Sequence, residues 1–237
     1  MNWKYSLAAG LIAGLPLLAG PAGPPQPGTV SYVEGEVQIA NRPISSAREQ
    51  AVGPNQRLTT KNGRAELLLV PGTYLRVDHR SAIRLEEASL SDVRLIVEHG
   101  AAIVNVIGKM RDADVEAVVG ATTVRFSRKG IYRVDAEDHS VAVYEGEAHI
   151  YGQGPSLSAT KNRKLVLAGT PKVVKIKGRP EDDFDHWSRV REKHLASMRS
   201  LAYARLYPGW YYDPFWGPYP YWWGPGYIGL WGGWRWR

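Results

Sequence analysis

Short stretches in which apolar and polar residues alternate follow one another from Gly28 to about Gly178. Alternation with a period of two turns one face of a strand toward a core, and its recurrence about every ten residues is typical of sandwiches and rolls. No part of this region has the period of 3.6 that an amphipathic helix requires. The pattern therefore predicts an all-β domain over residues 28–178, an antiparallel sandwich or roll of many short strands. The expected strands are Thr29–Val33, Val37–Ile39, Ala65–Val70, Tyr74–Val77, Ala82–Leu85, Val93–Val97, Ala101–Ile107, Val115–Val119, Thr122–Phe126, Ile131–Val134, Val141–Tyr144, Ala148–Tyr151, Lys164–Leu167 and Val173–Ile176.

Turn residues and an internal similarity support this reading. The Asn62-Gly63 and Pro71-Gly72 pairs separate expected strands and supply the backbone dihedrals of tight hairpins. The segments 33–39 and 144–150 share Glu, Gly, Glu and Ile in register, and 99–104 repeats the glycine with the small and aliphatic residues that follow it. The spacing is irregular, so a solenoid is not indicated, and we expect a duplicated β-unit that closes a single core.

The pattern changes after Arg179-Pro180, which ends the last expected strand. Asp182 or Asp183 is a suitable helix cap, and apolar residues then recur at spacings of three to five up to Leu206. We expect one amphipathic helix within residues 179–206 that docks on the β-domain. Its apolar face is expected to hold Phe184, Trp187, Val190, Leu195, Met198, Leu201 and Ala202, and its polar face Arg189, Arg191, Lys193 and Arg199.

Residues 207–237 have a composition unlike the rest of the chain. They contain 14 aromatic residues, 7 Gly and 5 Pro among 31 residues. Proline and glycine at this density disfavour a regular helix or ladder, so we expect an irregular, low-complexity tail without a core of its own.

The first residues resemble an export signal. Lys4 precedes the uncharged apolar stretch Tyr5–Gly20, and small residues lie where a signal peptidase cleaves, so we expect a signal peptide over residues 1–22. A Pro-rich linker, residues 23–27, leads into the β-domain. The protein is therefore expected to be exported, either to the periplasm, to the outer envelope or out of the cell. The alternative is an uncleaved N-terminal anchor.

Composition excludes several kinds of chemistry. The chain has no cysteine, which removes disulfides, thiolate metal sites and thiol nucleophiles. The net charge of +7 is spread along the chain without a basic run, so we expect no nucleic-acid binding. There is no Gly-x-Ser-x-Gly elbow and no Gly-rich phosphate loop. We therefore expect no enzymatic activity, no catalytic residue and no cofactor.

Two acidic clusters and the histidines are the remaining candidates for metal chemistry. Asp112, Asp114 and Glu116 alternate along one expected strand and offer oxygen ligands, but the glycine and terminal Glu of a calcium loop are missing. The cluster Glu181–His186 is denser, and acidic residues there fit the N-terminus of the expected helix. Asp78-His79 and Asp138-His139 fall in turns, and none of the six histidines has a spacing suited to zinc. We expect no metal site.

The stretch Leu58–Val77, followed by Ser81–Leu85, resembles the FecR-like domain, and Gly130–Asp135 and Val143–Ala148 are similar to its later blocks. The similarity covers most of residues 28–170 and implies an extracytoplasmic β-domain without specifying a ligand. The full layout is similar to that of secreted FecR-domain proteins. FecR itself, by this resemblance, is a periplasmic sensor with a cytoplasmic anti-sigma segment before one membrane span. Only Met1–Lys4 precede the apolar stretch here, so we expect no such segment.

The aromatic tail is the most distinctive binding candidate. Trp and Tyr rings stack on sugars or lie at membrane interfaces. The expected binding residues are Trp210, Tyr211, Tyr212, Trp216, Tyr221, Trp222, Trp223, Trp231, Trp234 and Trp236. The favoured function is an exported, non-enzymatic binding or scaffold module of the cell envelope, with the tail as an adhesion or anchoring element. Its expected partners are an envelope polysaccharide, the membrane interface or an envelope protein. The alternative is a FecR-type transmembrane signalling regulator with an uncleaved N-terminal anchor.

Overall fold

A computed structural model describes residues 26–44, 50–108, 114–151, 156–206, 210–213 and 217–220, with the backbone alone from residue 198 onward. The predicted signal peptide, residues 1–22, lies outside these ranges. Residues 26–178 of the described part are β-structure joined by turns, and one helix follows.

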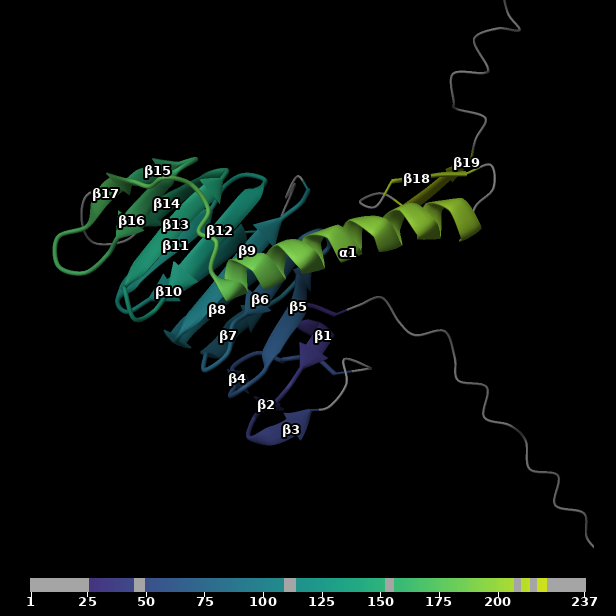
Figure 1. Ribbon diagram of the computed structural model, residues 1–237, viewed down its shortest axis with the longest axis horizontal. Helices are drawn as coiled ribbons and strands as arrows, with labels where there is room; N and C mark the ends of the chain where they lie inside the picture. The colour runs from purple at the N-terminus through teal and green to yellow at the C-terminus, as the bar shows by residue number, and fades with distance from the viewer. Residues whose placement is uncertain are drawn as a thin grey trace, which may run out of the picture.

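Two β-sheets pack face to face and form a sandwich (Figure 1). The eight-stranded sheet has the order β1 (Thr29–Glu34), β5 (Arg64–Val70), β6 (Thr73–Val77), β9 (Ala101–Val106), β12 (Gly130–Asp135), β13 (Ser140–Glu145), β16 (Arg163–Val166) and β17 (Lys172–Lys175). The nine-stranded sheet has the order β15 (Ser158–Thr160), β14 (Glu147–Tyr151), β11 (Thr122–Phe126), β10 (Asp114–Val119), β8 (Asp92–His99), β7 (Ala82–Ala88), β4 (Arg57–Thr60), β2 (Val37–Ile39) and β3 (Arg42–Ile44). Neighbouring strands are antiparallel except β8 and β10, which run parallel. The predicted all-β sandwich followed by one helix is confirmed.

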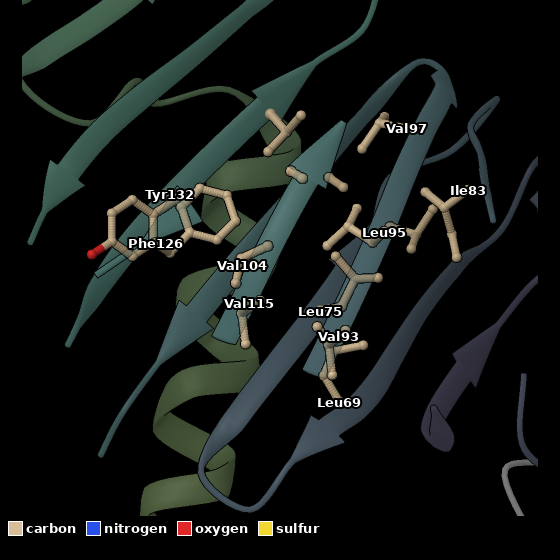
Figure 2. Close-up of a cluster of buried hydrophobic side chains, with 14 of the residues drawn as sticks. Leu69, Leu75, Ile83, Val93, Leu95, Val97, Val104, Val115, Phe126 and Tyr132 are labelled. Carbon is tan, nitrogen blue, oxygen red and sulfur yellow. The ribbon is translucent and has the colours of Figure 1, made fainter. Parts of the chain in front are cut away.

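The alternation seen in the sequence fills one continuous core between the sheets. Along β5, Ala65, Leu67 and Leu69 turn inward and are buried. Leucine and valine side chains from both sheets meet them, with the stacked rings of Phe126 and Tyr132, whose centroids are 4.5 Å apart, among the largest (Figure 2). Burial of this apolar surface is the main stabilising contribution to the sandwich.

The repeated Glu-Gly-Glu segments are corners at which the chain passes from one sheet to the other. Gly35 separates β1 from β2, and Gly146 separates β13 from β14. Both glycines have positive φ, 65° and 93°, in the region that other residues enter at a cost. The two segments lie in different halves of the sandwich, β1–β9 and β10–β17, each of which contributes strands to both sheets. The halves join where β9 pairs with β12 and β8 pairs with β10.

Three short strands of the sandwich were not predicted from the pattern. β3 contains a proline and has three residues, β15 also has three, and β4 begins in the polar segment before Lys61. β3 and β15 lie at the two edges of the nine-stranded sheet, where proline is tolerated and short strands are common. Three residues are too few to show an alternation.

The predicted helix is present as α1, Asp183–Leu206. It crosses the outer face of the eight-stranded sheet and continues past the margin of that sheet (Figure 1). No helix in the described ranges combines the length and the hydrophobicity that crossing a bilayer requires.

Part of the predicted irregular tail is a two-stranded antiparallel ladder. β18 (Trp210–Asp213) pairs with β19 (Gly217–Pro220), with Trp210 opposite Pro220 and Asp213 opposite Gly217. The expectation that proline and glycine suppress any regular ladder does not hold for these two strands. Two-stranded pairing tolerates prolines because each strand has only one neighbour and leaves its other edge without a partner.

Candidate functional site

The outer face of the eight-stranded sheet carries a row of charged and aromatic residues that face α1. The strand registers place Tyr32 beside Glu66, Glu66 beside Arg76, and Arg76 and Arg133 on the two sides of Ile103. Residues paired in this way point to the same face of a sheet. The residues before and after them on each strand point into the core between the sheets. The row therefore lies on the outer face of the sheet, which is the face that α1 covers.

An ion pair without solvent contact forms the centre of this contact. The side chains of Glu66 and Arg76 are both 0% exposed, and Arg76 Nε donates to Glu66 Oε2 at 2.9 Å. The other carboxylate oxygen of Glu66 accepts from Arg191 Nη2 on α1 at 2.9 Å and from Ser31 Oγ at 3.0 Å. Buried charges are costly unless they are paired and hydrogen bonded, and here the carboxylate has partners on both oxygens.

Arg76 also binds the helix directly. Its Nη1 donates to Ser188 Oγ at 3.1 Å and to Glu192 Oε1 at 3.2 Å. Arg179 donates to the same Glu192 carboxylate at 3.1 Å. Burial lowers the pKa of Arg76 below its ordinary value, although Glu66 and Glu192 oppose this shift. The guanidinium therefore links a strand to the middle of α1.

A second group of ion pairs holds the start of α1. Asp182 Oδ1 accepts the backbone N–H of Asp185 at 2.8 Å, which makes Asp182 the N-cap. Arg133 on β12 donates to both Asp182 and Asp185, and Arg179 Nε donates to Asp185 Oδ1 at 2.6 Å. The Asp185 side chain is 0% exposed. Tyr144 completes the cluster, with its hydroxyl 3.4 Å from Asp185 Oδ2.

The charges in this cluster shift one another's pKa values. Burial alone would raise the pKa of Asp182, but the Asp185 N–H and the Arg133 guanidinium outweigh it and lower the pKa. Burial would lower the pKa of Arg133, and the hydrogen bond and charge of Asp182 reverse this and raise it. Burial and the charge of Asp185 raise the pKa of Tyr144. The two groups together contain four arginines and four carboxylates, so their formal charges balance. We refer to Glu66, Arg76, Arg133, Tyr144, Arg179, Asp182, Asp185, Ser188, Arg191 and Glu192 as the charged seam.

Aromatic packing adds to the charged seam. Phe184 is buried against Ala101 and Ile103 and stacks on Trp187, with ring centroids 6.2 Å apart. The Arg191 guanidinium lies 3.9 Å from the centroid of the Tyr32 ring. Stacked rings and cation–π pairs each contribute about 0.5–2 kcal/mol beyond the burial of area.

The orientation of α1 differs from the predicted one. Val190, expected on the docked face, is 51% exposed, whereas Arg191, expected on the polar face, contacts the sheet. The helix is turned in this way because Glu66 and Arg76 need charged partners more than Val190 needs burial. The prediction that the helix docks on its own domain is confirmed.

The aromatic residues predicted to bind a ligand are described only in part. Trp210, Tyr211 and Tyr212 belong to β18, where Tyr211 is opposite Tyr219. The remaining predicted binding residues lie outside the described residues: Trp216, Tyr221, Trp222, Trp223, Trp231, Trp234 and Trp236.

The acidic clusters considered for metal chemistry bind arginines. Glu116 and Asp114 pair with Arg125 at 2.8 and 3.3 Å, and Asp112 lies outside the described residues. Asp78 accepts from Arg64 at 2.8 Å and lies 2.9 Å from His79 Nδ1. Across the described ranges, no group of three or more His, Asp or Glu residues is arranged to hold a metal ion.

The charged seam was not predicted, although part of its signal is visible in the sequence. Glu66 and Arg76 each stand between apolar residues of their strands, and opposite charges at such positions are a sign of pairing. Their alignment depends on the register between β5 and β6, which the sequence alone did not specify.

Comparison with known proteins gives limited similarity. No family model matches the chain, and no curated protein matches it. Among solved structures, two crystal structures of a "putative anti-sigma factor" from Parabacteroides distasonis ATCC 8503 superpose with TM-scores of 0.42 and 0.43 at 16% and 15% identity. They match 50% and 51% of this chain, which spans only 58% and 59% of theirs.

Proposed function

We propose that this protein is an exported, non-enzymatic FecR-like module of the cell envelope, in which the β-sandwich positions a helix and the aromatic segment after it binds an envelope surface. The observation that carries the proposal is the charged seam, which fixes α1 on the sandwich at both Asp182 and Arg191. A helix held at two such places has a defined direction, so the residues after Leu206 start from a defined point.

The composition of residues 207–237 supports a binding role for them. Fourteen aromatic rings exceed what the core of the sandwich uses, and the segment has only Asp213 to oppose Arg235 and Arg237. Such rings stack on sugars and settle at membrane interfaces. The seam itself is a poor candidate for acid–base catalysis, because its carboxylates are bound by arginines and the Tyr144 pKa is raised.

The test compares the full chain with a variant that ends at Leu206. Pull-down is measured on peptidoglycan, an envelope polysaccharide and outer-membrane vesicles. A third variant replaces the seven tryptophans after residue 207 with Phe, and a fourth replaces them with Ala. We expect the Phe variant to keep most of the binding and the Ala variant and the truncated chain to lose it, since stacking needs rings. Equal binding by the full and truncated chains would remove the tail from the function.

The exported state has its own test. N-terminal sequencing of the mature protein is expected to begin near Gly23. A chain that retains residues 1–22 would instead favour the alternative, a FecR-type transmembrane regulator.

A further inference from the structure

The strand β17 forms the edge of the eight-stranded sheet opposite β1, and no described strand pairs with its other side (Figure 1). The Ile176 N–H donates to the Asn162 carbonyl at 3.0 Å, which fixes the residues of this hairpin that form hydrogen-bonded pairs. In an antiparallel ladder such residues alternate with residues whose N–H and C=O groups face the other way. Val173 and Lys175 therefore direct these groups away from β16, toward the open edge.

The hairpin of β16 and β17 carries positive charge without acidic residues of its own. No Asp or Glu occurs anywhere in residues 148–180 of the sequence. Lys164 pairs with Asp138, from the turn between β12 and β13, at 3.0 Å. The other basic side chains of the hairpin have no ion-pair partner within the described ranges, and all are exposed: Lys161, Arg163, Lys172, Lys175 and Lys177.

Two of these cations lie directly opposite each other. The register pairs Arg163 with Lys175, in the closer, non-hydrogen-bonded kind of pair. Like charges directly opposite each other destabilise a sheet. Lysines on an edge strand discourage aggregation, which accounts for Lys172 and Lys175 but not for Arg163 on the interior strand β16. The repulsion is relieved when a carboxylate lies beside Lys175.

The side chains of β17 specify what a further strand has to present. Val173 packs against the core and Val174 is half-buried, so two apolar residues lie between Lys172 and Lys175. A strand added to this edge places one residue opposite each of the four. Charge complementarity then requires an acidic residue at each end and apolar residues between them.

We propose that β17 is a docking edge for an extended acidic segment of another protein, which pairs with the backbone of Val173 and Lys175 and places carboxylates opposite Lys172 and Lys175. Extended peptides add to open sheet edges in this way, with affinity from the main chain and specificity from alternate side chains. A nucleic acid or an anionic lipid can meet the charges but has no peptide groups to pair with the open N–H and C=O groups. A second copy of β17 is disfavoured, because antiparallel self-pairing sets lysine against lysine. Neither α1 nor the residues after Leu206 take part, so failure of this docking leaves the proposed function standing.

Binding of synthetic peptides to the full chain, measured by fluorescence anisotropy, is the first test. The probe is a capped peptide of sequence Glu-Thr-Glu-Val-Val-Glu, whose last four residues match β17 in the antiparallel direction. One control peptide has Lys in place of each Glu, and another keeps the carboxylates but has N-methyl groups on the backbone nitrogens that face β17. We expect the acidic probe to bind more weakly as salt is raised, and both controls to bind at least about tenfold more weakly than the probe. Hydrogen exchange is expected to show protection by the probe in the peptide covering 171–178.

Variants of Lys175 separate the charge from the backbone. Lys175→Ala removes the charge and keeps the N–H, whereas Lys175→Pro also removes the outward N–H without removing a bond between β16 and β17. We expect Lys175→Ala to weaken binding of the acidic probe about threefold to tenfold and Lys175→Pro to weaken it further. Lys193→Ala removes the same charge from an exposed residue of α1 and is expected to leave the affinity unchanged.

Charge reversal keeps the test independent of misfolding. A chain with both Lys172→Glu and Lys175→Glu is expected to bind the lysine peptide and to lose the acidic one. It is also expected to unfold at no lower a temperature than the parent, because Arg163 then faces a carboxylate. Several results would each overturn the proposal: no binding of the acidic peptide at millimolar concentration, equal binding of its N-methylated form, protection only outside 171–178, self-association of the chain through this segment, or tighter binding of a DNA oligonucleotide or of phosphatidylglycerol vesicles.

Discussion

Replacing Arg76 with Met tests whether the charged seam holds α1 on the sandwich. The substitution keeps most of the volume of the side chain and removes its charge and its donors. Glu66 then keeps only Arg191 and Ser31 as partners, in a place where its side chain is 0% exposed. The contacts to Ser188 and Glu192 are lost at the same time.

The expected cost follows from the burial of the pair. Breaking a fully buried ion pair by removing one partner destabilises proteins by about 3–5 kcal/mol, because a charge is left without compensation. The free energy of unfolding of a native domain is about 5–15 kcal/mol, so this loss is a large fraction of the total stability. Arg125→Met is the matched control, since Arg125 also binds two carboxylates but its side chain is 35% exposed. We expect this control to cost about 1 kcal/mol or less.

Urea denaturation followed by circular dichroism gives the free energy of unfolding of each variant. Hydrogen exchange of the peptide covering 183–197, read by mass spectrometry, reports whether α1 leaves the sheet before the sandwich unfolds. We expect Arg76→Met to lose protection in this peptide while the core strands retain theirs. A variant within 1 kcal/mol of the parent, with α1 protected as before, would refute the role assigned to the seam.

Two further substitutions test the cap of α1 and the corner between the sheets. Asp182→Asn keeps the helix cap and removes its charge. The pKa of Asp182 is lower in the folded protein than its ordinary value of 3.8. The charged carboxylate therefore stabilises the fold above pH 3.8, and this stabilisation is lost as the pH falls through the folded-state pKa. The difference in unfolding free energy between parent and variant, measured in urea from pH 7 to pH 2, is therefore expected to be largest near neutrality and to vanish in acid; a constant difference contradicts the assignment. Gly146→Ala places a Cβ 2.1 Å from the Tyr132 hydroxyl at a φ of 93°, whereas Gly169→Ala meets no atom within 4 Å at a φ of 67°. In thermal unfolding, we expect Gly169→Ala to lower the free energy of unfolding by about 1 kcal/mol, from backbone strain alone, and Gly146→Ala to lower it clearly more. Equal losses would show that the corner at Gly146 is not crowded.

The sequence was sufficient for the fold class because its main signals are local. The alternation of apolar and polar residues in β5 and β6 can be read from neighbouring residues alone. The same is true of the turn at Gly146, the glycine with positive φ between β13 and β14. The start of α1 at Asp183 followed from the acidic cap and the break at Pro180.

The charged seam was missed because it depends on contacts between distant residues. Glu66 and Arg191 are 125 positions apart, and their pairing turned α1 away from the orientation that its apolar residues alone favoured. Registers and helix rotation are properties of the assembled sheets and not of any one segment.

The join between the two halves of the sandwich has a consequence for how the molecule is built. Each half supplies strands to both sheets, and the halves meet by edge pairing of β9 with β12 and of β8 with β10. All six residues of β9 are buried, so a half cut free at this join would present an apolar open edge. The two halves therefore cover each other's strand edges, as the two subunits of a dimer do. The helix α1 connects them across the outer face, because it binds Glu66 in one half and Arg133 in the other. Produced as separate polypeptides, the two halves are expected to aggregate alone and to be soluble only when they are made together.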